Sequence, residues 1–138
     1  MTVLLDTNVL LDVLLARPPF AAESAKVYDA CDRGELTGFL CASAVTDLFY
    51  IIRKATKDRG RARALIEDIC QGLAIAPVNR SVIVEALGST QEDFEDAVAA
   101  AAGRAVNVDA IVTLDPAGFR GASLPVHSPR EIVEMWGL

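Results

Sequence analysis

Residues 3–12, VLLDTNVLLD, place an aspartate and two small polar residues between two apolar runs. The first run has the length and apolar character of a short buried strand, and residues 7–16 have the length of a helix. A strand that leads into a helix needs only one capping side chain at the junction. Asp6, Thr7 and Asn8 therefore exceed what local structure requires, and this junction is the first candidate for a functional site.

The same alternation of short apolar runs and longer segments with helical spacing continues along the chain. Further strands are predicted at residues 38–41, 73–78, 109–114 and 124–127, and helices at 20–33, 44–57, 61–72, 81–87, about 90–105 and from 129 onward. Ser43 and Thr90 are the expected N-caps of two of these helices, and Ser128 with Glu131 forms a capping box. Strands that alternate with helices favour an α/β fold with a small, mostly parallel sheet flanked by helices.

The size and composition of the chain exclude several classes of protein. With 138 residues, the chain is expected to form a single domain, residues 1–138. Acidic residues interrupt every long apolar run, so no membrane span is predicted. The first residues lack a basic leader, which argues against secretion and for a cytoplasmic protein. The three cysteines show no metal-binding spacing and are interpreted as reduced core residues.

The charge is unevenly distributed, although the net charge is −6. Six of the thirteen basic residues lie in the segment RKATKDRGRAR, residues 53–63. An acidic protein with one basic strip can still bind a phosphate backbone there, and Arg53, Lys54 and Lys57 are the candidates for that contact. The alternative is a solvated helix face, which is the commoner role of a charged stretch. His127, the only histidine, is expected to be structural.

Acidic residues follow the predicted strands where those strands end. Asp6 and Asp115 come directly after strands, Asp47 lies one turn into a helix that follows a strand, and Asp96 lies two turns into the helix capped by Thr90. Sites in open α/β sheets form beyond the carboxyl ends of the strands. Four carboxylates are therefore expected to converge, with Asp93 as a fifth candidate, although any one of them can instead be an ordinary cap.

A cluster of carboxylates requires a cation, because the charges would otherwise repel one another. Ligands that are all oxygen suit Mg²⁺ or Mn²⁺. Such an ion can activate water and stabilise the leaving oxygen in phosphodiester hydrolysis. Asp6 would then be a metal ligand, and Thr7 and Asn8 would orient it or contact the substrate phosphate.

Four segments together resemble the PIN domain, the fold of the ribonuclease toxins of bacterial VapBC-type toxin–antitoxin pairs. They are LLDTNVLLDVL (4–14), SAVTDLFYIIRK (43–54), DFEDAVAAAAGRAVNVDAIVTLD (93–115) and PAGF (116–119). The resemblance implies a Mg²⁺- or Mn²⁺-dependent endoribonuclease with Asp6, Asp47, Asp96 and Asp115 at its metal site. It also implies that Thr113 supports the site together with Thr7 and Asn8. An RNA substrate, a homodimer and a cognate antitoxin whose tail fills the acidic groove are further implications.

The sequence departs from the family pattern at two positions. Asp47 stands where the family very often has Glu, and Leu114 stands where many relatives carry a polar or basic residue. Two other classes of protein remain as alternatives. A phosphoacceptor receiver domain also gathers acids at strand ends, but no lysine follows Lys57 to provide its late-strand Lys. The second alternative is a catalytically silent PIN-like RNA-binding or regulatory module, and no residue of the sequence argues against it.

Overall fold

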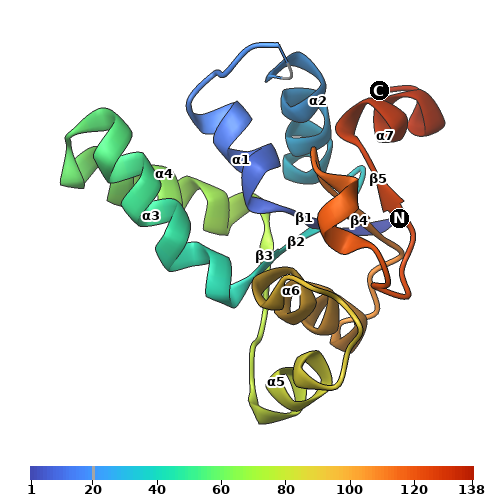
Figure 1. Cartoon of the computed structure of the whole chain (residues 1–138). Coiled ribbons are helices and arrows are strands. Elements are labelled where there is room, and N and C mark those ends of the chain that lie inside the picture. The colour runs from blue at the N-terminus through green and yellow to red at the C-terminus, as the bar shows by residue number, and fades with distance from the viewer. Residues whose placement is uncertain (20) are drawn as a thin grey trace.

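A five-stranded parallel sheet forms the centre of the computed structural model, which describes residues 1–19 and 21–138 (Figure 1). The strands are β1 (Thr2–Leu5), β2 (Thr37–Cys41), β3 (Ala74–Ala76), β4 (Ala110–Val112) and β5 (Val126–His127). Their spatial order is β3-β2-β1-β4-β5. The chain moves outward from β1 to β2 and β3, and then returns to the other side of β1. In such sheets, the crevice between the strands where the direction reverses is the preferred place for a ligand.

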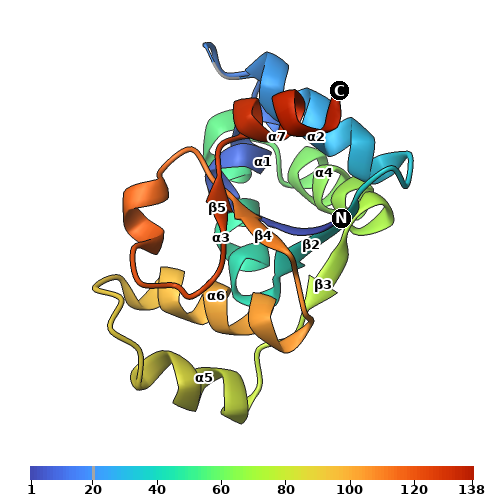
Figure 2. The same ribbon diagram turned by 90° about the vertical axis from the view of Figure 1, so that its right-hand side faces the viewer.

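Helices cover both faces of the sheet. They are α1 (Thr7–Leu14), α2 (Ala21–Asp32), α3 (Ala42–Thr56), α4 (Arg59–Gly72), α5 (Arg80–Leu87), α6 (Phe94–Ala105) and α7 (Pro129–Trp136), with a 3₁₀ helix at Pro116–Phe119. Figure 2 shows α5 and α6 on one side of the sheet, and α1, α2, α4 and α7 on the other. The α/β class and the small parallel sheet flanked by helices are thus confirmed.

The sheet has a hydrophobic core on each face, and successive side chains of the central strands point alternately into one core and the other. Val3 and Leu5 of β1 pack into the core under α1, α2, α4 and α7, whereas Leu4 packs against α5 and α6. The neighbouring strand β4 divides in the same way, with Val112 on the first side and Ile111 on the second. Because both faces are covered, these strands are apolar throughout, which explains the uninterrupted apolar run at the start of the chain.

Two predicted helix caps are wrong. Helix α3 begins directly where β2 ends, so its N-cap is the extended residue Cys41 and not Ser43. Helix α6 begins at Phe94, because the carboxylate of Asp93 accepts the N–H of Asp96 at 2.9 Å; Thr90 lies before this turn. The Ser128–Glu131 capping box is confirmed. The predicted start of the second helix at Phe20 lies outside the described residues.

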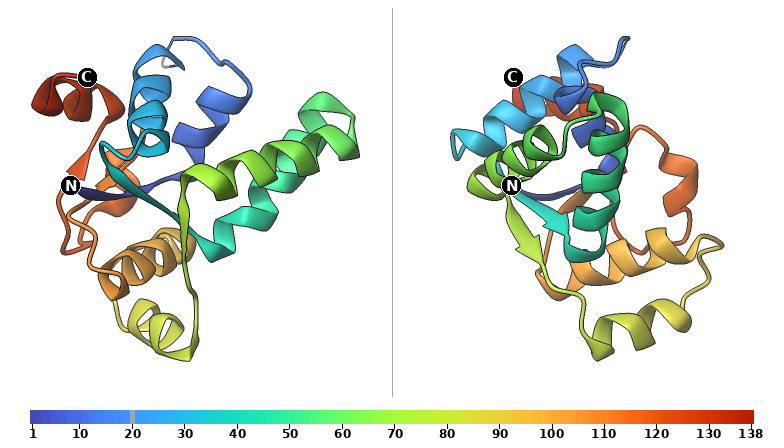
Figure 3. Two further views of the ribbon diagram at one scale, coloured as in Figure 1. Left: turned by 180° about the vertical axis from the view of Figure 1, so that it is seen from behind. Right: turned by 90° about the vertical axis from the view of Figure 1, so that its left-hand side faces the viewer.

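Helices α3 and α4 form a hairpin that extends beyond the sheet (Figure 3). Lys57 ends α3 in the left-handed conformation, with φ of 55°, and the carboxylate of Asp58 caps α4. The basic segment 53–63 lies at this turn. Cys31 and Cys41 are buried as expected, but Cys70 of α4 is exposed. Within the described part of the chain, none of the helices has the length and apolarity that a bilayer span requires.

Candidate active site

A cavity of about 640 Å³ opens at the carboxyl ends of β1 and β4, next to the first turns of α1, α3 and α6. Its acidic lining residues are Asp6, Asp47, Glu95, Asp96 and Asp115, and Thr7 and Asn8 also face it. Four acids predicted from separate stretches of sequence therefore line one cavity. Leu11, Tyr50, Ile51 and Phe119 contribute apolar wall.

Both carboxylate oxygens of Asp6 are held in place. Oδ1 accepts the N–H of Thr7 at 2.8 Å, and Oδ2 accepts the hydroxyl of Thr113 at 2.7 Å. Burial raises the pKa of Asp6, and the hydrogen bonds from Thr113 and Thr7 oppose that rise. Asp6 thus caps α1 and is also presented to the cavity in a fixed orientation.

Thr113 and Asn8 tie the ends of β1 and β4 together. The Thr113 hydroxyl, which is fully buried, accepts the N–H of Asp115 at 3.0 Å and the amide of Asn8 at 3.3 Å. The side-chain oxygen of Asn8 accepts the N–H of Leu114 at 3.2 Å. These bonds explain why the junction after β1 is polar: it fixes two neighbouring strand ends and so aligns Asp6 with Asp115.

Asp96 carries the strongest electrostatic perturbation in the cavity. Burial, followed by the charges of Asp6, Asp93 and Asp115, raises the pKa of Asp96 to about 7. Its carboxylate lies directly against the Cα of Gly118, where a Cβ would collide with Oδ2. The glycine therefore lets α6 bring Asp96 next to the loop that carries Asp115.

Of the remaining acids, Asp47 lines the cavity as predicted, and Asp93 does not. Asp47 is exposed on α3 and lines the cavity, whereas Asp93 caps α6 and borders a smaller, separate cavity with Gly118 and Arg120. Glu95 lines the main cavity and was not predicted. It is adjacent to Asp96 in the sequence, but only the position of the start of α6 over the sheet edge brings both side chains to the cavity.

The donor set suits a hard cation. Among residues 1–19 and 21–138, no three Asp, Glu, Cys or His side chains are arranged as a ready-made set of metal ligands. The acidic side chains that line the cavity are nonetheless all oxygen donors, and the charges of Asp6, Asp93 and Asp115 add to burial in raising the pKa of Asp96, a repulsion that a cation would relieve. Oxygen donors of this kind fit Mg²⁺ or Mn²⁺.

The predicted RNA-binding side chains lie outside the cavity. Arg53, Lys54 and Lys57 are exposed, and no carboxylate in the described part of the chain forms an ion pair with them. They lie near the turn of the α3–α4 hairpin, at the end of the helix that carries Asp47.

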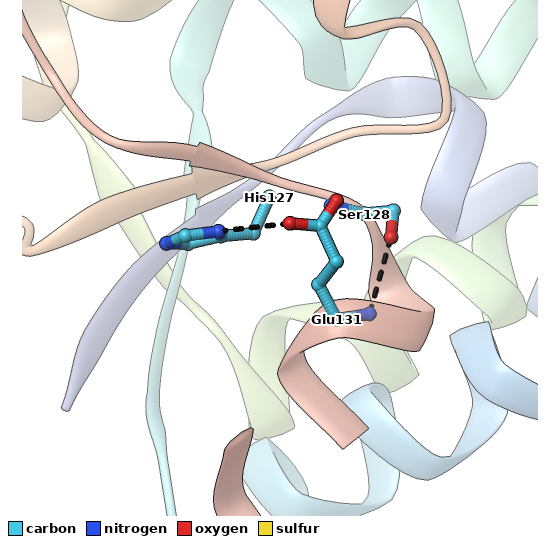
Figure 4. Close-up of polar contacts among 3 residues, drawn as sticks. All are labelled: His127, Ser128 and Glu131. Atoms are coloured by element: carbon cyan, nitrogen blue, oxygen red, sulfur yellow. Dashed lines mark hydrogen bonds and ion pairs between the residues drawn. The ribbon is translucent and has the colours of Figure 1, made fainter. Parts of the chain in front are cut away.

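His127 does not line the cavity. Its Nδ1 lies 3.3 Å from the carboxylate of Glu131, the residue that completes the α7 capping box with Ser128 (Figure 4). Its backbone carbonyl accepts the N–H of Thr113 at 3.0 Å. The expected structural role of His127 agrees with these contacts.

Replacing Thr113 with valine is expected to destabilise the fold by about 1–3 kcal/mol, because the N–H of Asp115 and a carboxylate oxygen of Asp6 each lose a partner. Urea unfolding in EDTA measures the change. Thr46→Val, at an exposed site, is the matched control and should shift stability by less than about 0.5 kcal/mol. Equal stability of the two variants would contradict the role assigned to the buried hydroxyl.

The raised pKa of Asp96 predicts a pH-dependent stability in the absence of metal. The native carboxyl keeps its proton up to about pH 7, whereas its ordinary pKa is 3.8, so the native state binds more protons between these values. Stability should therefore fall as the pH rises from about 4 to about 7. Thermal unfolding in EDTA should show a flatter profile for Asp96→Asn, and identical profiles would contradict the prediction.

Comparison with known proteins gives a consistent picture of the fold. A family model described as PIN domain matches residues 2–117. No curated protein sequence matches the chain. A similar solved structure is the complex VapBC2 from Rickettsia felis bound to a DNA fragment from its promoter, with a TM-score of 0.73 at 15% identity, covering 93% of this chain and 98% of that chain. FitAB bound to the IR36 DNA fragment gives a TM-score of 0.69 at 18% identity, covering 99% of this chain and 96% of that chain. FitAcB from Neisseria gonorrhoeae gives a TM-score of 0.66 at 17% identity, covering 93% of this chain and 98% of that chain.

Proposed function

Because the chain belongs to the PIN domain family, we propose that it is a Mg²⁺- or Mn²⁺-dependent endoribonuclease that hydrolyses RNA phosphodiester bonds. PIN domains are generally nucleases, so the family supports a hydrolase. The observation that carries the proposal is the cavity at the carboxyl edge of the sheet, which Asp6, Asp47, Asp96 and Asp115 line. Residues 1–138 are proposed to act as one domain.

Each residue of the cavity has a proposed role. Asp6, Asp47, Asp96 and Asp115 would hold the cation, which when bound polarises the phosphate, activates water and stabilises the leaving oxygen. Thr113 keeps Asp6 in its orientation, and Asn8 fixes the loop that carries Asp115. Thr7 offers its hydroxyl at the edge of the cavity to a phosphate oxygen. Asp93 supports the site through the cap of α6.

We also propose that the protein is the toxin of a type II toxin–antitoxin pair, with a cognate antitoxin, a homodimeric state and a cytoplasmic location. The support is the similarity to VapBC2 and FitAB, although at 15–18% identity that similarity by itself shows only the fold. The alternative is a catalytically silent PIN-like RNA-binding or regulatory module. The exposure of Asp47 and its short side chain favour that alternative.

Cleavage of single-stranded or looped RNA by the purified protein tests the proposal. Cleavage should require Mg²⁺ or Mn²⁺, stop with EDTA and return when the metal is restored in excess. Activity that survives thorough chelation would contradict the metal mechanism. RNA binding without cleavage under any of these conditions would support the silent module.

Neutralising Arg53, Lys54 and Lys57 together is expected to weaken RNA binding and flatten its salt dependence. Each lost phosphate contact removes about 0.7 from the slope of log K against log salt for a single strand, so the triple variant should lose up to about 2. Neutralising Lys26, Arg80 and Arg130, which lie on other helices, is the control. An unchanged slope in the first variant would restore the interpretation of a solvated helix face.

A further inference from the structure

One face of α3 runs from the acidic cavity out along the hairpin. The residues of α3 that line the cavity are Ser43, Ala44, Asp47, Tyr50 and Ile51. Their spacing of three and four residues is that of a single helical stripe. The next residue on this stripe is Lys54, about 10 Å beyond Asp47 along the helix axis at roughly 1.5 Å per residue. The stripe therefore presents a carboxylate, then an aromatic ring, then a cation.

Tyr50 is unusually exposed for an aromatic residue beside a cavity. Its exposed fraction is 63%, the second highest among the large hydrophobic residues that stand out on the surface. The ring of Phe49 meets it edge-on, with centroids 5.6 Å apart and planes at 82°. Tyr50 also borders the groove between α3 and α4. Its side chain therefore forms the ridge between that groove and the acidic cavity.

We propose that Tyr50 is a stacking platform for a nucleobase of single-stranded RNA, with Lys54 binding the adjacent phosphate. This inference rests on the proposed function, because it places the phosphate on the other side of that base over the carboxylates of the cavity. Any base can stack on an aromatic ring, so the platform adds affinity without demanding a particular sequence. A cation one turn beyond the ring complements a phosphate, which favours a nucleic acid over an apolar protein surface as the occupant.

Binding of a labelled single-stranded RNA, measured by fluorescence anisotropy with Mn²⁺, tests this platform. The parent protein is the Asp96→Asn variant, in which hydrolysis is expected to be lost. Tyr50→Ala should weaken binding by about tenfold or more, and Tyr50→Phe should bind like the parent. Lys54→Ala should also weaken binding. The matched controls are Trp136→Ala, an exposed aromatic residue on α7, and Lys26→Ala on α2, and both should bind like the parent.

A strand of the same length with no bases separates stacking from other effects. Tyr50→Ala should bind this sugar-phosphate strand as the parent does, whereas Lys54→Ala should weaken binding to both strands. An equal loss on both strands for Tyr50→Ala would overturn the proposal. So would an absence of measurable RNA binding by the parent, or an effect of Tyr50→Ala confined to self-association in sedimentation, which would assign the ring to a second copy of the chain.

Failure of the stacking platform can be distinguished from failure of the proposed nuclease function. Metal-dependent cleavage by the unmodified protein, together with no base-dependent effect of Tyr50→Ala, would overturn only the stacking platform. Base-dependent binding through Tyr50 without cleavage by the unmodified protein would overturn the nuclease and retain the platform.

Discussion

Replacing Asp96 with asparagine is expected to reduce RNA cleavage by orders of magnitude while leaving the metal-free protein at least as stable as before. Burial and the charges of Asp6, Asp93 and Asp115 raise the pKa of the Asp96 carboxyl to about 7, so above pH 7 the substitution removes one negative charge from the cavity. Repulsion falls, so stability in EDTA should hold or rise. The asparagine retains the size of the side chain, which limits any loss of packing.

The same variant should gain less stability from Mn²⁺. A ligand that binds only the native state adds about 2.7 kcal/mol at 100 times its dissociation constant, and the gain shrinks as affinity falls. Thermal unfolding with and without Mn²⁺, beside a cleavage assay, measures both effects. Asp29→Asn, at an exposed position on α2, is the matched control and should behave like the unmodified protein. Equal Mn²⁺ stabilisation and equal cleavage for Asp96→Asn would show that Asp96 is an ordinary helix residue.

Replacing Gly118 with alanine is also expected to reduce RNA cleavage, though by less than Asp96→Asn does. A Cβ at this position would collide with Oδ2 of Asp96 and lie 3.5 Å from Oδ2 of Asp115. The backbone of Gly118 lies outside the left-handed region, so the alanine itself is not strained. Asp96 must move, and kcat should fall at least tenfold, since small misplacements at a reacting centre cost about a hundredfold in rate. The KM for RNA should change little, because the basic strip lies elsewhere.

Gly88→Ala is the control for this prediction, because a Cβ there would meet only ordinary contacts at 3.7 Å. A double variant gives a sharper check. In an Asp96→Ala background the collision is gone, so Gly118→Ala should cause no further loss of Mn²⁺ stabilisation. Unimpaired cleavage by the single variant, or an equal further loss in the double variant, would contradict the positioning of Asp96 by Gly118.

Patterns along the chain predicted the strands and the edge of the sheet at which Asp6 and Asp115 lie. The apolar run Val3–Leu5 predicts a strand because both of its faces are buried, and Asp6 and Asp115 follow directly because parallel strands end at one edge. Contacts between side chains of different helices and loops could not be predicted from these patterns. The need for glycine at position 118 arises from a carboxylate on α6, and a local pattern contains no such distance.

The helix starts show a similar limit. The path of the backbone determines which residue is the N-cap of a helix. The N-caps of α3 and α6 are therefore Cys41 and Asp93, although Ser43 and Thr90 nearby have side chains suited to capping. That path also decides that Glu95 reaches the cavity while Asp93 does not. Such choices depend on how each helix docks on the sheet, and spacing alone does not specify docking.

The position of β4 beside β1 has a consequence for synthesis of the chain on the ribosome. The first acid emerges early, but the N–H of Asp6 bonds to the carbonyl of Val112 at 2.9 Å, and its carboxylate is oriented by Thr113. A nascent or truncated chain that ends before β4 therefore has neither the strand that orients Asp6 nor Asp115. The nuclease proposed for this chain would stay inactive throughout most of its translation, and an interrupted message would yield an inactive fragment.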